Sequence, residues 1–198
     1  MRVILVLFLY LLLNGCASFQ QHKLSTIDLS KSIVSQKHEL AYFNVVVIDA
    51  HGNESHGANG VIQNKLQTVI ENSSIFDKVY LSNHNKDTYF EFLYSSEANL
   101  LKAGLTGAIS GVTFTLFPVF VTDPWVLTVR VYKNGSFQKE YVYRDEIRTW
   151  FHLTMIFVAP FKPIVPATYE LFDNMASNFL VDFSKESGVR EVANLTNR

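Results

Sequence analysis

The stretch WVLTVRVYKNGSFQKEYVYRDE, residues 125–146, decides the fold that this sequence predicts. Its two halves, 125–132 and 137–144, are rich in β-branched and aromatic residues, which favour β-strands. Asn134 and Gly135 lie between them, and this pair is typical of the tight turn of a β-hairpin. The sequence therefore predicts two long antiparallel strands joined by a short turn.

The length of that turn sets the register of the hairpin, and the sequence leaves two registers open. A two-residue turn places Val129 opposite Glu140. A three-residue loop with Gly135 in the left-handed region instead places the apolar residues of the first strand on the face of Phe137 and Tyr141. The two registers put different side chains into the core.

Further elements flank the hairpin on both sides. The run 42–48 (YFNVVVI) is continuously apolar, as expected of a central strand. After a polar loop at 49–60, Asn59 is placed to cap a helix with apolar residues at helical spacing. Shorter strands are predicted at 75–81 and 89–94. A final helix, 168–185, places five apolar residues on one face, namely Phe172, Met175, Ala176, Phe179 and Phe183.

This order of elements predicts one α/β (α+β) domain with a mixed β-sheet and two principal helices, in the order β-α-β-β-(apolar stretch)-β-β-(apolar stretch)-α. The domain is expected to span 40–188, with Gly188 ending the last helix. Residues 16–39 are polar and without period, and are predicted to be a tether. Residues 189–198 are predicted to be a flexible tail.

The N-terminus predicts a bacterial lipoprotein signal. Arg2 precedes an uninterrupted apolar run, and Leu13-Asn14-Gly15-Cys16 matches the lipobox, with cleavage between Gly15 and Cys16 and acylation of the Cys16 thiol. Residues 1–15 are then the signal peptide. No Asp follows the cysteine to retain the protein in the inner membrane, so the outer membrane is expected. Cys16 is the only cysteine, which excludes an internal disulfide in the mature chain.

Two apolar stretches, 103–122 and 150–167, adjoin the ends of the hairpin. Glycine, proline and β-branched residues in the first disfavour a membrane-spanning helix, and we expect both to be buried or interface-facing. The chain has 16 Phe and nine Tyr, so aromatic residues form either a large core or an interaction surface. The candidates for an interface are Phe114, Phe117, Phe120, Trp125, Trp150, Phe151 and Phe157.

Residues that could support catalysis or bind a metal ion are few in this sequence. Asp49, His51, Glu54 and His56 crowd one Gly-rich loop and are weak candidates for metal ligands, although solvation alone accounts for such a loop. No nucleophile motif, phosphate-binding loop or dinucleotide fingerprint occurs, so we expect neither an enzyme nor a cofactor. The formal net charge of −1, with scattered basic residues, gives no indication of nucleic-acid binding.

The segments NVVVID, LQTVIENSSIFDKVYL, YFEFLY and WVLTVRVYKNGSFQKEYVYRDE, in this order, resemble a domain shared by the curli-secretion channel lipoprotein, the flagellar outer-membrane lipoprotein and the penicillin-binding-protein activator lipoproteins. The resemblance covers roughly half of the mature chain. It implies a periplasmic accessory domain. The two apolar stretches depart from the shared pattern, and the channel-forming relative is the one whose similar domain has membrane-spanning hairpins.

We therefore expect a lipid-anchored protein of the outer membrane that faces the periplasm, with exposure at the cell surface left open. Its expected work is binding to another envelope protein through a sheet edge or aromatic surface. The alternative is a membrane-active or channel-forming oligomer, and so a homo-oligomer, built from 103–122 and 150–167.

The lipobox yields a direct prediction. Cys16→Ser removes the acceptor atom, so the variant is expected to lose acylation and to stay uncleaved or be released from the outer membrane. Metabolic labelling with a fatty acid checks this. Equal labelling of the variant and the wild type would contradict the lipoprotein interpretation.

Overall fold

The computed structural model describes most of the chain after the predicted signal peptide. The described residues are 16–27, 29, 38–82, 88–98, 118–158, 161–162 and 164–196. The predicted signal peptide, Gly15, Phe114 and Phe117 lie outside the described residues, as does most of the first apolar stretch.

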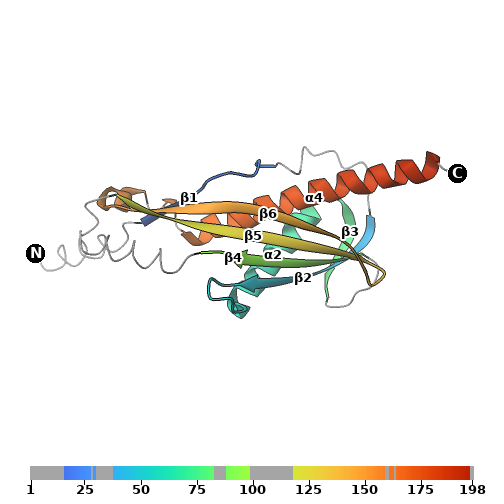
Figure 1. Ribbon diagram of the computed structural model, residues 1–198, viewed down its shortest axis with the longest axis horizontal. Helices are drawn as coiled ribbons and strands as arrows, with labels where there is room; N and C mark the ends of the chain where they lie inside the picture. Colours follow the sequence, from blue (N-terminus) through green and yellow to red (C-terminus); the bar gives the residue numbers. More distant parts are fainter. Residues whose placement is uncertain are drawn as a thin grey trace, which may run out of the picture.

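The described residues form a six-stranded sheet and two long helices (Figure 1). The strand order is β1-β6-β5-β4-β2-β3, in which β2 is parallel to β3 and β4 and the other pairs are antiparallel. This mixed sheet confirms the predicted single α+β domain. The strands are β1 (Cys16–Gln20), β2 (His38–Ile48), β3 (Phe76–Leu81), β4 (Thr88–Ser96), β5 (Val119–Lys133) and β6 (Ser136–Phe151), and the helices are α2 (His56–Ser73), α4 (Ile164–Thr196) and the short 3-10 helix η2 (Leu153–Phe157).

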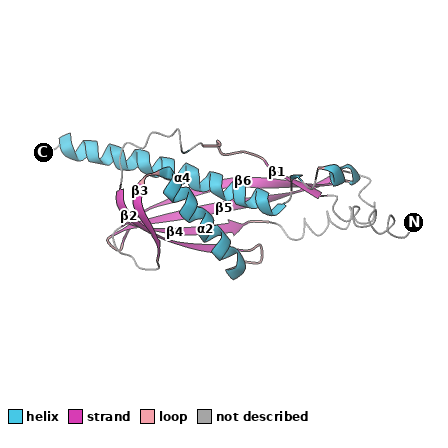
Figure 2. Ribbon diagram, turned by 180° about the vertical axis from the view of Figure 1, so that it is seen from behind, coloured by secondary structure: helices cyan, strands magenta, loops and turns pink. Residues whose placement is uncertain are grey.

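Both long helices lie on the same side of the sheet (Figure 2). They cover alternate residues of the strands, such as Val45, Phe92 and Val129, which pair across β2, β4 and β5 and are buried. The opposite side, which we call the open face, has no helix of the described residues against it (Figure 1). The core is therefore a single layer between one sheet face and two helices.

Aromatic rings fill much of this core. Phe179 of α4 makes edge-on contacts with Phe90 and Phe92 of β4 and with Tyr141 of β6, at centroid distances of 5.3–5.4 Å. Of the apolar face predicted for the last helix, Phe172, Met175, Ala176 and Phe179 are fully buried and Phe183 packs against them. The aromatic surplus is thus partly core.

The observed register of the hairpin combines features of both predicted registers. Asn134 and Gly135 both have positive φ, 51° and 76°, and form a two-residue turn. The register then shifts between Val131 and Tyr132, so that Val129 pairs with Tyr141 and Tyr132 pairs with Phe137. This β-bulge leaves Phe137 on the open face, whereas the three-residue loop predicted it on the core face beside Tyr141.

The segment after Cys16 differs from the predicted tether. Residues Cys16–Gln20 form the edge strand β1, which pairs with β6 from Phe151 to Ile147. This five-residue segment is too short to stand out as a strand in the sequence, and only pairing with the edge of β6 makes a strand of it. The sheet therefore begins at the residue predicted to be acylated.

Two helix boundaries also differ from those predicted. The last helix begins at Ile164 rather than Thr168, because Pro166 in a first turn needs no intrahelical N–H bond, and it passes Gly188 to end at Thr196. The earlier helix begins at His56, with Ser55 at its N-cap position. Asn59, predicted as its cap, instead accepts a hydrogen bond from the backbone N–H of Val47 at 2.9 Å.

The aromatic core predicts a large effect of one truncation. Phe179→Ala is expected to lower the free energy of unfolding by about 3–5 kcal/mol, because it leaves a cavity among four rings. Val142→Ala, an exposed position on β6, should change it by no more than about 0.5 kcal/mol. Urea unfolding measures the free energy of unfolding of the two variants. Equal losses of this free energy in both would contradict the described core.

Candidate functional site

Cys16 lies at one end of the sheet, with its backbone opposite Phe151. Its side chain is exposed, whereas the next two residues are buried: Ala17 is 0% and Ser18 is 2% exposed. The Ser18 and Thr149 hydroxyls form a hydrogen bond of 2.8 Å between β1 and β6. The predicted acylation site is therefore fixed directly to the folded domain.

The chain that follows β1 is also held against β6. The buried Asp145 carboxylate accepts hydrogen bonds from the backbone N–H groups of Lys23 and Leu24, at 3.2 and 3.4 Å. The Lys23 ammonium lies 2.6 Å from a carboxylate oxygen of Glu146. These contacts extend the attachment of the N-terminal segment beyond the strand itself.

The predicted interface aromatics that are described divide between the two faces of the sheet. Phe120 and Trp150 pair across β5 and β6 on the open face, with ring centroids 5.1 Å apart, and the Arg148 guanidinium lies 4.9 Å from the Phe120 ring. Phe157 in η2 is 79% exposed, and Phe151 is half-buried. These four residues lie at the Cys16 end of the sheet.

Trp125 lies on the other face. Its ring stacks on Tyr94 at 4.5 Å against the core, and its indole N–H donates to Asp123 at 2.9 Å. Burial raises the pKa of the Asp123 carboxyl, while the hydrogen bonds from Ser96 and Trp125 oppose that shift. Trp125 is therefore partly buried against the core, on the face opposite Phe120 and Trp150.

A row of five aromatic residues crosses the open face near the hairpin turn. Adjacent members are backbone partners on adjacent strands, from β3 to β6: Tyr80, Tyr42, Tyr89, Tyr132 and Phe137. Ring centroids lie 5.7–5.9 Å apart in three of the pairs. We call this set the aromatic row. Its two ends are exposed, Tyr80 by 48% and Phe137 by 56%.

An ion-pair row lies in register beside the aromatic row. Glu91, Arg130 and Glu140 are backbone partners across β4, β5 and β6. The Arg130 guanidinium donates to Glu140 at 2.9 Å and to Glu91 at 3.3 Å. The hydrogen bond to Glu140, followed by that to Glu91, raises the pKa of Arg130. This row gives the open face polar groups that are already paired within the chain.

Sequence inspection did not find the aromatic row. Its members come from five strands. Phe137 lies opposite Tyr132 because of the two-residue turn, and the bulge between Val131 and Tyr132 places it on the other face from Tyr141. In the sequence, the row is indicated by the tyrosines that begin the predicted strands 42–48 and 89–94. Placing them side by side requires the parallel register of β2 and β4.

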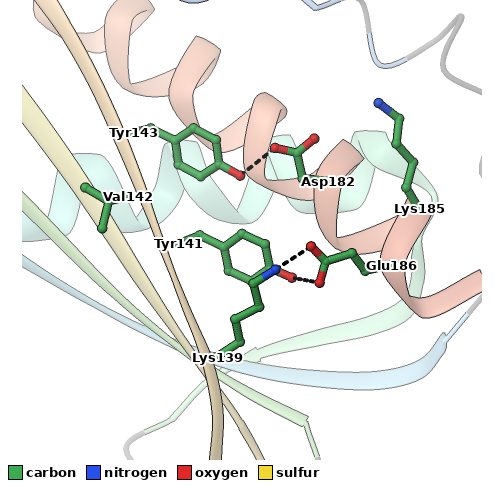
Figure 3. Close-up of a pocket in the computed structure, with 7 residues that line it drawn as sticks. All are labelled: Lys139, Tyr141, Val142, Tyr143, Asp182, Lys185 and Glu186. Carbon is green, nitrogen blue, oxygen red and sulfur yellow. Dashed lines mark hydrogen bonds and ion pairs between the residues drawn. The ribbon is translucent and has the colours of Figure 1, made fainter. Parts of the chain in front are cut away.

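A groove of about 420 Å³ lies between β6 and α4 (Figure 3). The Tyr143 hydroxyl donates to Asp182 at 2.9 Å, the Tyr141 hydroxyl donates to Glu186 at 2.9 Å, and Lys139 pairs with Glu186. Burial, and then the hydrogen bond to Asp182, raises the pKa of Tyr143 well above its usual value. The Tyr143 hydroxyl therefore stays protonated, and both tyrosine hydroxyls engage carboxylates of α4, so these contacts fasten the helix to the sheet.

The candidate metal loop is held by its own backbone. The Asp49 carboxylate accepts hydrogen bonds from the N–H groups of Asn53 and His51, both at 2.9 Å, and these contacts, Asn53 foremost, lower its pKa. His56 lies 3.6 Å from Glu54. Among the described residues, no three His, Cys, Asp or Glu side chains are grouped so that they could hold a metal ion.

Comparison with known proteins gives structural matches alone. No family model and no curated protein matches the chain. Among solved structures, it is similar to a minor lipoprotein from Acinetobacter baumannii (9% identity, 77% of this chain and 95% of that one, TM-score 0.47), a PelC dodecamer from Paraburkholderia phytofirmans (10%, 82% and 96%, 0.35) and a DUF330 protein from Xanthomonas campestris (9%, 82% and 92%, 0.36).

None of the three TM-scores reaches 0.5. The resemblance to the curli-secretion, flagellar and penicillin-binding-protein activator lipoproteins stays a prediction. In the part of the chain that the structure describes, no helix combines the length and apolarity needed to cross a bilayer.

Proposed function

We propose that this protein is a lipid-anchored accessory protein of the bacterial cell envelope, and that it acts by binding another envelope protein through the open face of its sheet. The aromatic row is the observation that carries this proposal. It joins five strands into one apolar band that ends in two exposed rings, Tyr80 and Phe137. Aromatic side chains of this kind are enriched in protein interfaces.

The rigidity of the row supports binding to a preformed surface. Tyr42, Tyr89 and Tyr132 are held by backbone pairing on both sides, and Tyr80 and Phe137 by pairing on one side, so little backbone entropy is lost when a partner docks. The adjacent ion pairs of Arg130 with Glu91 and Glu140 are satisfied within the chain. A partner therefore does not have to compensate for buried charge at that edge of the band.

The chemistry of the other sites supports a binding role over catalysis. The carboxylates of the groove between β6 and α4 are engaged by tyrosine hydroxyls and Lys139, and the Asp49 loop by its own backbone. Neither site aligns a nucleophile with a base. We propose that the protein performs no bond chemistry, and that the anchor at Cys16 raises the local concentration of the domain at the outer membrane.

A photoreactive amino acid placed on the open face tests this proposal. Substitution at Phe137 or at Tyr80 is expected to give one discrete crosslinked adduct in intact cells, because both positions end the aromatic row. Gln67, exposed on α2 behind the sheet, is the matched control and should give no such adduct. Adducts are identified by mass spectrometry.

A second variant links the adduct to the row itself. Tyr132→Ser, at a half-buried position within the row, should reduce the crosslinking from Tyr80 severalfold while the urea midpoint of the protein shifts only modestly. Equal adducts from Gln67 and Phe137, or none from the open face, would contradict the proposal. Adducts made only of the chain with itself would favour the homo-oligomeric alternative.

A further inference from the structure

We propose that the Cys16 end of the domain is a membrane-contact surface, which seats directly on the phospholipid bilayer that holds the lipid anchor. This surface comprises Phe120, Trp150, Phe151, Phe157, Phe161, Ile164 and Val165. It goes beyond the proposed function, and it rests on that proposal for the acylation of Cys16.

The first observation is that no linker separates Cys16, the predicted acylation site, from the folded domain. Cys16 is the first residue of β1, and the next residue, Ala17, is completely buried. The backbone N–H of Ser18 donates to the Lys162 carbonyl at 2.9 Å, which ties β1 to the segment before α4 as well as to β6. An acyl chain on the Cys16 thiol thus leaves directly from this end of the sheet.

The second observation is where the exposed apolar side chains lie. Among the described residues, the two most exposed large apolar side chains are Phe157 and Phe161, each 79% exposed. Phe120, Ile164 and Val165 add exposures of 48%, 48% and 54%. All five belong to the end where β1 begins, β5 begins, β6 ends and α4 begins (Figure 1).

These side chains are presented by ordered backbone. The N–H of Met155 donates to the carbonyl of His152, the N–H of Val158 to that of Met155, and the N–H of Phe161 to that of Val158, each at 2.9 Å. These hydrogen bonds constrain the backbone near Phe157 and Phe161, whose side chains are exposed. Exposure of phenylalanine side chains to water is unfavourable, and apolar surroundings stabilise them.

The third observation is charge. Between Glu146 and Glu170 the sequence has no acidic residue, and its only charged residues are Arg148 and Lys162. Arg148 lies over the Phe120 ring, beside Trp150. A tryptophan with basic residues at the edge of an apolar patch is typical of a membrane interface, where the cations meet phosphate groups.

The bilayer fits this surface better than a protein partner does, because the anchor leads to it. Cys16 and Phe151 are partners on adjacent antiparallel strands, so their Cα atoms lie about 5 Å apart. Acyl chains attached to Cys16 therefore bring the lipid headgroups close to these side chains. A second copy of the chain or another protein remains an outcome that the experiment detects.

Vesicle cosedimentation tests the proposal without the acyl chains. The chain from residue 16 onward with Cys16→Ser contains every described helix and strand. It is mixed with vesicles of phosphatidylethanolamine and phosphatidylglycerol. Measurable binding is expected, and the double variant Phe157→Ser with Phe161→Ser should reduce the partition coefficient by about tenfold or more. Both positions are exposed, and an unchanged urea midpoint shows that the variant folds.

The matched control is Tyr80→Ser with Phe137→Ser, which removes two exposed rings from the far end of the open face. It should bind vesicles as the parent chain does. No binding by the parent, or equal losses in both double variants, would overturn the proposal. Self-association that disappears in the Phe157 and Phe161 variant would assign the surface to a second copy of the chain and also overturn it.

Mass spectrometry of the native protein separates this inference from the proposed function. An unmodified Cys16 with vesicle binding intact would refute the lipid anchor alone. An acylated Cys16 with no vesicle binding by the Cys16→Ser chain would refute the membrane-contact surface alone.

Discussion

The pairing of β5 with β6 is the constraint on which the rest of the structure depends. It runs from the turn at Asn134 to the pair of Val119 with Phe151, with one bulge between Val131 and Tyr132. At about 3.3 Å per residue, these strands span about 45 Å, so they set the length of the sheet. Strand β1 pairs with the edge of β6, and α4 packs on one face of β5 and β6. The chain has a single cysteine and therefore no internal disulfide. The pairing of β5 with β6 and the aromatic core stabilise the elongated domain instead.

The hairpin also separates the two proposed surfaces along its length. Its far end carries Tyr132 and Phe137 of the aromatic row, next to the bulge. Its near end holds Cys16 beside Phe151 and the exposed rings of η2 and the segment before α4. Because the described helices α2 and α4 lie on one face of the sheet, the open face connects these two ends. An anchored domain with this geometry points its aromatic row away from the membrane.

The elements with a periodic pattern of apolar residues could be predicted from the sequence. The elements that form only against another part of the chain could not. The central strand, the hairpin and the apolar face of the last helix follow from local pattern, and the structure has them. Residues 16–20 have no pattern of their own and become a strand only against β6. Phe137 changes face because one bulged residue shifts the register, and Trp125 joins the core because Tyr94 stacks on it. The aromatic row required five strands in register, which local sequence does not encode.

Depth measurement in a membrane tests the central claim, that the Cys16 end lies at the bilayer and the aromatic row far from it. Acylation consumes the Cys16 thiol, so a single added cysteine can be labelled with a fluorophore in the native, lipidated protein. Thr154 in η2 and Ser136 at the hairpin turn are both exposed and serve as the two positions. In vesicles containing lipids with nitroxide headgroups, we expect strong quenching at Thr154→Cys and little at Ser136→Cys. Equal quenching at the two positions, or stronger quenching at Ser136→Cys, would contradict it.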